Sequence, residues 1–227
     1  MNYKQILLAA SVACAALVGC EPEIERAANE FFYPSSFEVD TVRMWHGYDF
    51  ALRFTNIAEY SPSKGGRSKE RYKQYVYYFG DFGYREEGCW GDCDDINNWP
   101  SACCVCDIMS IHVATQEDFD EAHPAGSYID DLMVVRLESA YPFIKSNYKL
   151  DGYDYNYREN RPDNEFYLNE VNPDYLKLNG HCFAYLNFLK SPAVKGEHTF
   201  IITVEMGADP VSGYVPEFKP QEITVSF

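Results

Sequence analysis

Residues 198–206, HTFIITVEM, alternate between apolar and polar side chains near the end of the chain. The segment 221–227, QEITVSF, repeats the same pattern after a turn-rich stretch. Successive side chains of a β-strand point to opposite faces, so a period of two with one polar face indicates a strand that is buried on one side only. The two segments therefore predict a pair of half-exposed strands.

Similar short segments precede this pair, and clusters rich in Gly, Pro, Asn and Asp separate them. The further strands that we expect are 37–42, 45–54, 72–79, 108–114, 132–137, 143–150 and 183–189. Residues 64–73 are expected to form a solvated loop, and a short helical turn is expected at 116–122. This succession of strands and turns predicts an all-β fold, an antiparallel immunoglobulin-like β-sandwich with long disulfide-bearing loops.

The first twenty residues have the plan of a bacterial lipoprotein signal. Lys4 precedes an apolar run that ends in Leu17-Val18-Gly19-Cys20. The run is shorter than the roughly 20 residues that a membrane-spanning helix needs, so we expect a cleaved signal over residues 1–19. Cys20 would then carry the lipid. The alternative is an ordinary secretory signal, for which an Ala-x-Ala cleavage pattern would be more typical.

The predicted domain organisation follows from this signal. Residues 20–36 contain three Glu soon after Cys20, and we expect them to form an acidic tether. Such residues resemble the surface-export signal of Bacteroidetes lipoproteins, although a short charge run is also typical of a plain solvated linker. The β-sandwich domain is expected to occupy residues 37–227.

The charge of the chain argues against nucleic acid as a partner. The formal net charge is −16 at pH 7, and such a surface repels phosphate backbones and anionic headgroups. We therefore expect the protein to contact the membrane through the lipid on Cys20, and we expect no cofactor.

Two segments carry a resemblance to a known family. They are residues 108–135, IMSIHVATQEDFDEAHPAGSYIDDLMVV, and the tail EHTFIITVEMGADPVSGYVPEFKPQEITVSF. Both resemble uncharacterised lipoproteins of gut Bacteroidetes. The resemblance implies a lipid-anchored β-sandwich at the outer membrane, and it implies no particular activity.

Six cysteines remain after removal of the signal and modification of Cys20: Cys89, Cys93, Cys103, Cys104, Cys106 and Cys182. An even number in an exported chain predicts disulfides, because the compartment is oxidising. Full pairing would require Cys182 to bond one of the other five. Neighbouring cysteines rarely bond each other, so Cys103 and Cys104 are expected to have different partners. Zinc bound by four of the thiolates is the competing interpretation, although the spacing is not that of a standard zinc site.

Two other polar segments are candidate binding sites. Asp92, Asp94, Asp95, Asn97 and Asn98 offer oxygen ligands that suit calcium, but their order does not match an EF-hand, so a polar turn is the simpler interpretation. Tyr153, Tyr155 and Tyr157 alternate with polar residues. In an extended segment their rings would share one face, which could stack on a sugar, or could instead cover the edge of the sandwich.

The sequence contains neither a G-x-S-x-G elbow nor an H-E-x-x-H zinc motif, and its five histidines are scattered. We therefore expect neither catalytic nor metal-binding residues. The predicted function is non-enzymatic binding of a glycan or a protein by a lipid-anchored outer-membrane protein that faces outward. The alternatives are a structural accessory subunit of an outer-membrane assembly and a small hydrolase.

Overall fold

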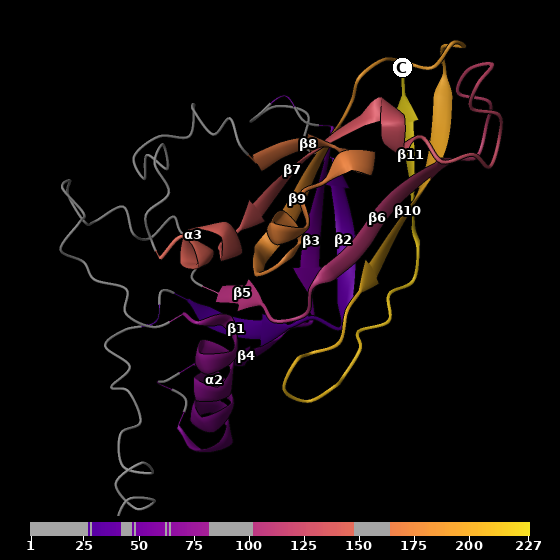
Figure 1. The fold of residues 1–227 in the computed structure, drawn as a ribbon. Helices are drawn as coiled ribbons and strands as arrows, with labels where there is room; N and C mark the ends of the chain where they lie inside the picture. The colour runs from indigo at the N-terminus through magenta and orange to yellow at the C-terminus, as the bar shows by residue number, and fades with distance from the viewer. Residues whose placement is uncertain are drawn as a thin grey trace, which may run out of the picture.

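The folded part of the chain consists mainly of β-sheet (Figure 1). The computed structural model describes residues 27, 29–41, 47, 49–61, 63, 65–81, 102–147 and 164–227. Within these residues, eleven strands form three sheets, and the two α-helices, α2 and α3, are short. The predicted all-β class is confirmed at this level.

The strands have the following bounds: β1 (Glu30–Tyr33), β2 (Ser36–Thr41), β3 (Phe50–Thr55), β4 (Ala58–Tyr60), β5 (Ala102–Cys104), β6 (Ile108–Thr115), β7 (Met133–Ser139), β8 (Glu165–Tyr167), β9 (Asn179–Phe188), β10 (Glu197–Met206) and β11 (Gln221–Ser226). The helices are α2 (Gly66–Phe79) and α3 (Tyr141–Lys145). The short turns of 3₁₀ helix are Asp130–Leu132, Leu168–Glu170 and Pro173–Leu176.

The sheets differ in size and in strand direction. A five-stranded sheet has the order β2-β3-β9-β7-β8, and a three-stranded sheet has the order β11-β10-β6. A small third sheet has the order β4-β1-β5, in which β1 and β5 run parallel. The prediction of an entirely antiparallel fold is therefore wrong for this pair, and the immunoglobulin-like topology stays a prediction.

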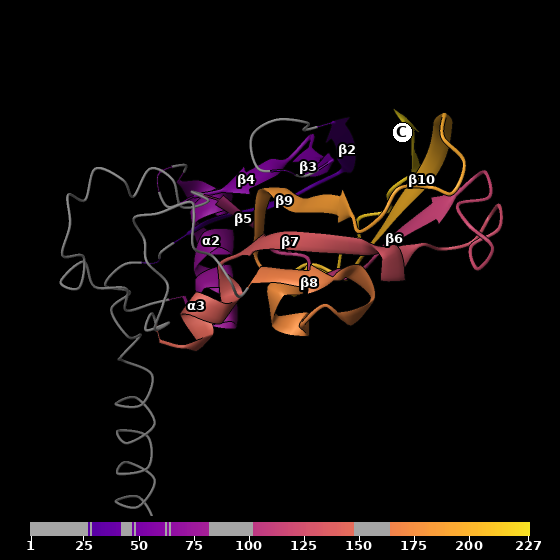
Figure 2. The ribbon, with the colours of Figure 1, turned by 90° about the horizontal axis from the view of Figure 1, so that it is seen from above.

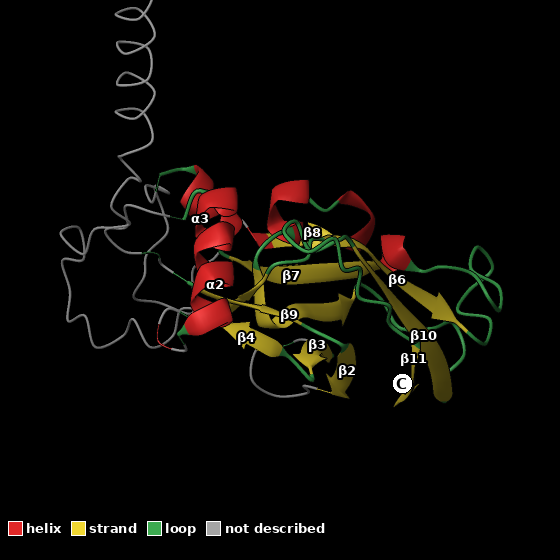
Figure 3. Cartoon of the chain, turned by 90° about the horizontal axis from the view of Figure 1, so that it is seen from below, coloured by secondary structure: helices red, strands yellow, loops and turns green. Residues whose placement is uncertain are grey.

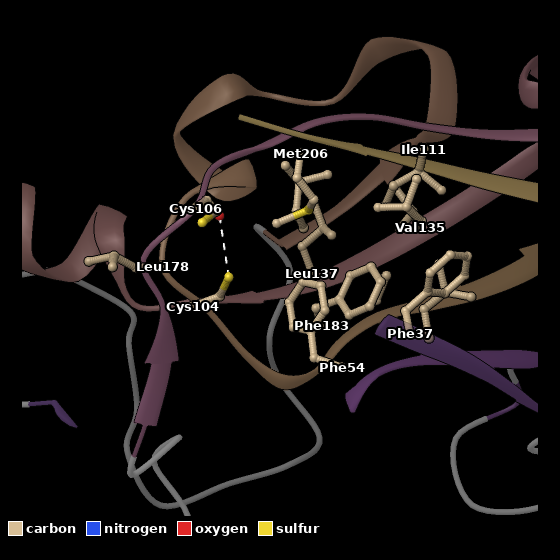
Figure 4. Packing of buried hydrophobic residues seen from close by; sticks show 14 of the residues in the cluster. Phe37, Phe54, Cys104, Cys106, Ile111, Val135, Leu137, Leu178, Phe183 and Met206 are labelled. Carbon is tan, nitrogen blue, oxygen red and sulfur yellow. Dashed lines mark hydrogen bonds between the residues drawn. The ribbon is translucent and has the colours of Figure 1, made fainter. Parts of the chain in front are cut away.

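Buried and more exposed side chains alternate along the strands that form the core, as the sequence predicts. In β7, Met133, Val135 and Leu137 are fully buried, and the residues between them are partly exposed. In β10, Phe200, Ile202 and Val204 are buried in the same way. Rings from the two larger sheets meet across the interior, with the centroids of Phe188 and Phe200 5.0 Å apart. Figure 4 shows side chains of both sheets, such as Met206 and Leu137, packed between them.

Helix α2 replaces the strand expected at 72–79 and most of the loop expected at 64–73. The helix begins after Gly65 and ends at Gly80, whose φ of 67° is in the left-handed region that glycine tolerates well. Its buried residues are Tyr72, Tyr75, Val76 and Phe79, which have the spacing of one helix face. The many aromatic residues of this segment favoured a strand, but their spacing of three and four residues favours a helix.

Two other expectations of secondary structure are wrong. A strand was expected at 143–150, but residues 141–145 form α3, and residues 148–150 lie outside the described part of the chain. Pro142 lies in the first helical turn, where its missing N–H costs nothing. The helical turn expected at 116–122 is absent because carboxylates bind the backbone N–H groups there. Asp120 Oδ1 accepts hydrogen bonds from the N–H groups of Ala122 (2.9 Å) and His123 (3.0 Å).

The folded domain begins earlier than predicted. Residues 30–36 were expected to belong to the acidic tether, but β1 is the central strand of the small sheet. Phe31 and Phe32 are both fully buried, and they point to opposite sides of this strand. Phe31 contacts α2 through Tyr75, with ring centroids 5.7 Å apart, and Phe32 contacts His181 of β9 at 4.5 Å. The small sheet therefore joins α2 to the five-stranded sheet.

The three sheets and two helices form an elongated arrangement. Figures 2 and 3 show α2 and α3 at one end of the molecule and the ends of β6 and β10 at the other end. The small sheet lies beside α2 at the helical end. The loop between β10 and β11 extends toward this end as well, in yellow in Figure 1.

Substitution of Phe31 by Ala tests whether residues 30–33 belong to the core. We expect Phe31→Ala to lower the free energy of unfolding by about 3–5 kcal/mol, because it removes a fully buried ring and leaves a cavity. Denaturant unfolding measures the change. Val194→Ala is the control, because Val194 is 67% exposed and should cost less than about 0.5 kcal/mol. A similarly small change for Phe31→Ala would contradict the assignment of β1 to the core.

Candidate functional site

Several of the predicted site residues lie outside the described part of the structure. They are the lipid-attachment residue Cys20, the cysteines Cys89 and Cys93, the polar segment 92–98 and the tyrosines Tyr153, Tyr155 and Tyr157. Their predicted roles stay predictions.

The other four cysteines carry free thiols in the structure. Cys103, Cys104 and Cys106 are buried, and Cys182 is partly buried. Burial raises the pKa of the Cys103 and Cys104 thiols, which keeps both protonated near neutral pH. The predicted full set of disulfides is therefore not confirmed for these four residues.

A cluster of four tyrosines forms where four segments of the chain meet. Tyr33 ends β1, Tyr60 ends β4, Tyr75 lies in α2, and Tyr214 lies in the loop between β10 and β11. We call these four residues the tyrosine cluster. The ring centroids are 5.9 Å apart for Tyr33 and Tyr60, 5.5 Å for Tyr60 and Tyr75, and 5.5 Å for Tyr33 and Tyr214. Tyr75 is fully buried, Tyr33 and Tyr60 are partly buried, and Tyr214 is 46% exposed.

The register of the small sheet explains why two of these rings share a face. Phe31 lies opposite Tyr60, and Tyr33 lies opposite Ala58. Residues two apart in a strand share a face, so Tyr33 lies on the same side as Phe31, and the pairing places Tyr60 there too. Helix α2 covers this side of the sheet, and its Tyr75 ring packs against Tyr60 from the helix side.

Asp209 holds the loop that carries Tyr214. Its Oδ2 accepts a hydrogen bond from the Tyr75 hydroxyl (2.7 Å) and another from the Ser212 hydroxyl. Its Oδ1 accepts one from the backbone N–H of Val211 (2.8 Å). The backbone N–H of Asp209 donates to the carbonyl oxygen of Tyr214 at 2.7 Å. One buried carboxylate thus joins α2 to this loop and fixes its conformation.

The hydrogen bonds around Asp209 keep its carboxylate ionised. Burial raises its pKa, but the bonds donated by Ser212, Tyr75 and the backbone N–H groups outweigh this effect, so the pKa lies below its usual range. Burial and the hydrogen bond with Tyr33 raise the pKa of Tyr60 to about 12. Tyr60 therefore carries a neutral hydroxyl, which both donates and accepts hydrogen bonds.

Ion pairs and hydrogen bonds hold the acidic segment between β6 and β7 in place. His123 Nδ1 lies 2.7 Å from Asp120 Oδ1, and its Nε2 lies 3.2 Å from Asp131 Oδ1. Lys190 Nζ lies 2.7 Å from Asp120 Oδ2. Hydrogen bonds from Lys190 and from His123 lower the pKa of Asp120 well below its usual range. These contacts fix the loop against the segment that follows β9.

His112 occupies the outer face of β6, as the alternating pattern predicts. Its Nδ1 lies 2.7 Å from Asp130 Oδ2, and its ring lies 5.1 Å from that of Tyr128, which is 61% exposed. The other oxygen of Asp130 accepts the N–H of Val113 at 2.8 Å. Asp130 therefore positions His112 and the backbone of β6 together.

Two properties of the described residues bear on metal and membrane binding. No three His, Cys, Asp or Glu side chains among them are grouped in a way that could hold a metal ion. No helix in this part of the chain is long and apolar enough to cross a membrane.

Comparisons of the chain with protein-family profiles, with curated proteins and with solved structures find no match.

The tyrosine cluster was not anticipated from the sequence. Its members are far apart along the chain, and each belongs to a different strand, helix or loop. The high tyrosine content was the only available signal, and it does not show which of the 19 tyrosines meet. The pairing of β1 with β4 and the hydrogen bond between Tyr75 and Asp209 help to bring the segments together.

Substitution of Tyr75 by Phe tests the support of this cluster. The variant keeps the ring and removes one hydrogen bond to the buried Asp209 carboxylate, so we expect the free energy of unfolding to fall by about 1–3 kcal/mol. Denaturant unfolding at neutral pH measures the loss. Tyr78→Phe is the matched control on the same helix, because Tyr78 is 62% exposed. Equal effects of the two variants would show that the Tyr75 hydroxyl contributes nothing to the cluster.

Proposed function

We propose that the protein is a lipid-anchored component of the cell envelope that binds an external ligand and carries out no catalysis. The anchor part of the proposal depends on Leu17-Val18-Gly19-Cys20, which has the residue types of a lipoprotein cleavage site. A chain held by several acyl groups stays on a membrane, whereas one chain alone binds only reversibly. The outer membrane, with the β-domain facing outward, is the proposed location.

The binding part of the proposal is carried by one observation, the preformed tyrosine cluster. Three partly exposed rings from three segments are held in contact by a buried tyrosine and a buried carboxylate. Rigid aromatic side chains supply contact area with little loss of conformational entropy. A site that is ordered before its ligand arrives loses less free energy on binding than a flexible loop does.

A glycan is the ligand that suits this cluster best, and a protein partner is the other ligand in the proposal. The flat ring of Tyr214 is exposed, and such rings stack on the apolar faces of sugars. The neutral hydroxyl of Tyr60 can exchange hydrogen bonds with sugar hydroxyls. The net charge of −16 disfavours anionic ligands but leaves neutral sugars unaffected.

An accessory role in an outer-membrane assembly is the second candidate. The observation that favours it is the set of edge strands: β2 and β8 end the five-stranded sheet, and β11 ends the three-stranded one on the side away from β6. An edge strand can pair with a strand of another protein. A subunit of this kind should co-purify with a fixed partner and show no response to glycans.

Protease treatment of intact cells tests the location. We expect the wild-type domain to be digested in intact cells, because a lipid on Cys20 would hold it at the outer surface. The Cys20→Ala variant should leave the membrane fraction, since its anchor cannot form. Protection of the wild-type protein until lysis would contradict the outward orientation, and a membrane-bound Cys20→Ala variant would contradict the lipid anchor.

Fluorescence titration with a panel of soluble polysaccharides tests the ligand. We expect a saturable change in tyrosine and tryptophan emission, and we expect Tyr214→Ala to weaken binding at least tenfold by removing the exposed ring. Tyr167→Ala is the control, because Tyr167 is 52% exposed but lies on β8. Loss of binding in Tyr153→Ala or Tyr155→Ala, with Tyr214→Ala unaffected, would move the site to the segment predicted from the sequence.

A further inference from the structure

Three cysteines lie close together at the end of β5, and their thiols point in different directions. Cys103 Sγ donates a hydrogen bond to Asn29 Oδ1 at 3.3 Å. Cys104 Sγ donates to the backbone carbonyl oxygen of Cys106 at 3.4 Å. Adjacent residues of a strand point to opposite faces, so Cys103 and Cys104 occupy different sides of the small sheet. The Cys104 thiol is thereby directed toward Cys106.

The chain bends just after β5, and the bend brings Cys106 close to Cys104. The backbone N–H of Val105 donates to the carbonyl oxygen of Phe32 at 2.9 Å, which holds the bend against β1. Two residues of extended chain span at most ~7 Å, and a bend shortens this span. Disulfides form between Cα atoms that are about 4.4–6.8 Å apart, and a bend of this kind is compatible with that range. After burial, the Cys106 side chain is the main cause of the raised pKa of Cys104. Figure 4 shows the Cys104 sulfur directed toward Cys106.

The fourth described cysteine lies elsewhere. Cys182 is in β9 opposite Arg53, and its side chain interacts with Arg53 and with Tyr185. Its neighbour Phe183 is fully buried and points into the core, so Cys182 lies on the outer face of the five-stranded sheet. Among the cysteines that the structure describes, Cys104 and Cys106 are therefore the pair in which the thiol of one residue contacts the other residue.

We propose that Cys104 and Cys106 are joined by a disulfide in the exported protein, which closes a Cys-Val-Cys ring at the end of β5. The inference rests on the oxidising location that the proposed function requires. The two thiols lose two protons and two electrons as one S–S bond forms. A disulfide of the oxidative folding machinery accepts the electrons, so that its own S–S bond breaks and two thiols are released.

The burial of this pair sets when the bond forms. Both residues are only 1% exposed in the folded domain, and an oxidant cannot reach them there. Burial also keeps the Cys104 thiol protonated, whereas thiol–disulfide exchange requires a thiolate. The bond therefore forms during folding, when the segment is accessible, and it is then protected from reduction.

Differential alkylation tests the pairing on the full-length exported protein. The protein is denatured in N-ethylmaleimide, reduced, treated with iodoacetamide, and digested, and fragment-ion mass spectrometry locates each label. In the wild type, Cys104 and Cys106 should carry the second label only. In Cys104→Ser, Cys106 should carry the first label, because its partner has been removed. Cys103→Ser is the matched control and should leave both residues with the second label.

Three outcomes would overturn the pairing, and they differ in what else they exclude. N-ethylmaleimide on Cys104 and Cys106 of the wild type, with the other cysteines protected, would exclude this disulfide and leave the oxidising location intact. N-ethylmaleimide on all six cysteines that follow Cys20 would exclude both this disulfide and the oxidising location. Release of a cysteine other than Cys106 by Cys104→Ser would assign Cys104 to another partner. The wild-type measurement can still overturn the pairing if the variants do not fold, because the first label on either residue excludes the bond.

Discussion

The short strand β1 is the constraint on which the arrangement of the domain depends. It is only four residues long, yet it pairs with β4 on one side and β5 on the other. Phe31 packs against α2, and Phe32 packs against the five-stranded sheet. The two faces of β1 are therefore buried against different elements. Without it, β4 and β5 would have no strand to pair with, and α2 would lose its contacts with Phe31. Burial of two aromatic side chains supplies several kcal/mol at about 25 cal/mol per Å² of apolar surface, which is a large fraction of the stability of an ordinary domain.

The same strand positions the surface that we assign to binding. Tyr33 ends β1, and its ring contacts both Tyr60 and Tyr214. Asp209 provides the second support, since a buried carboxylate that accepts several hydrogen bonds is costly to disturb. A rigid aromatic surface thus results from structural contacts alone. Tyr60 contributes a neutral hydroxyl to this surface, in a chain whose overall charge is strongly negative.

The regular strands were predictable, because alternation of apolar and polar residues is a local property of β6, β7, β10 and β11. The errors arose where two patterns compete. Residues 72–79 are rich in Tyr, Val and Phe, which favour strands, but the spacing of Tyr72, Val76 and Phe79 places them on one face of a helix. Strand β1 was missed because four residues beside an acidic stretch show no period. The tyrosine cluster depends on contacts between distant segments, and no local pattern in the sequence predicts which segments come together.

Hydrogen exchange of the backbone amides is the most direct test of the claim that the tyrosine cluster has a rigid support. The decisive amides are those of Phe32 and Tyr33 in β1 and of Asp209, Val211 and Gly213 in the loop. Exchange of β1 as slow as that of the central strand β9, with strong protection of the three loop amides, is the result that the account predicts. Exchange of either segment at the rate of an unstructured peptide would show that the rings have no fixed arrangement, and the account of a preformed binding surface would be wrong.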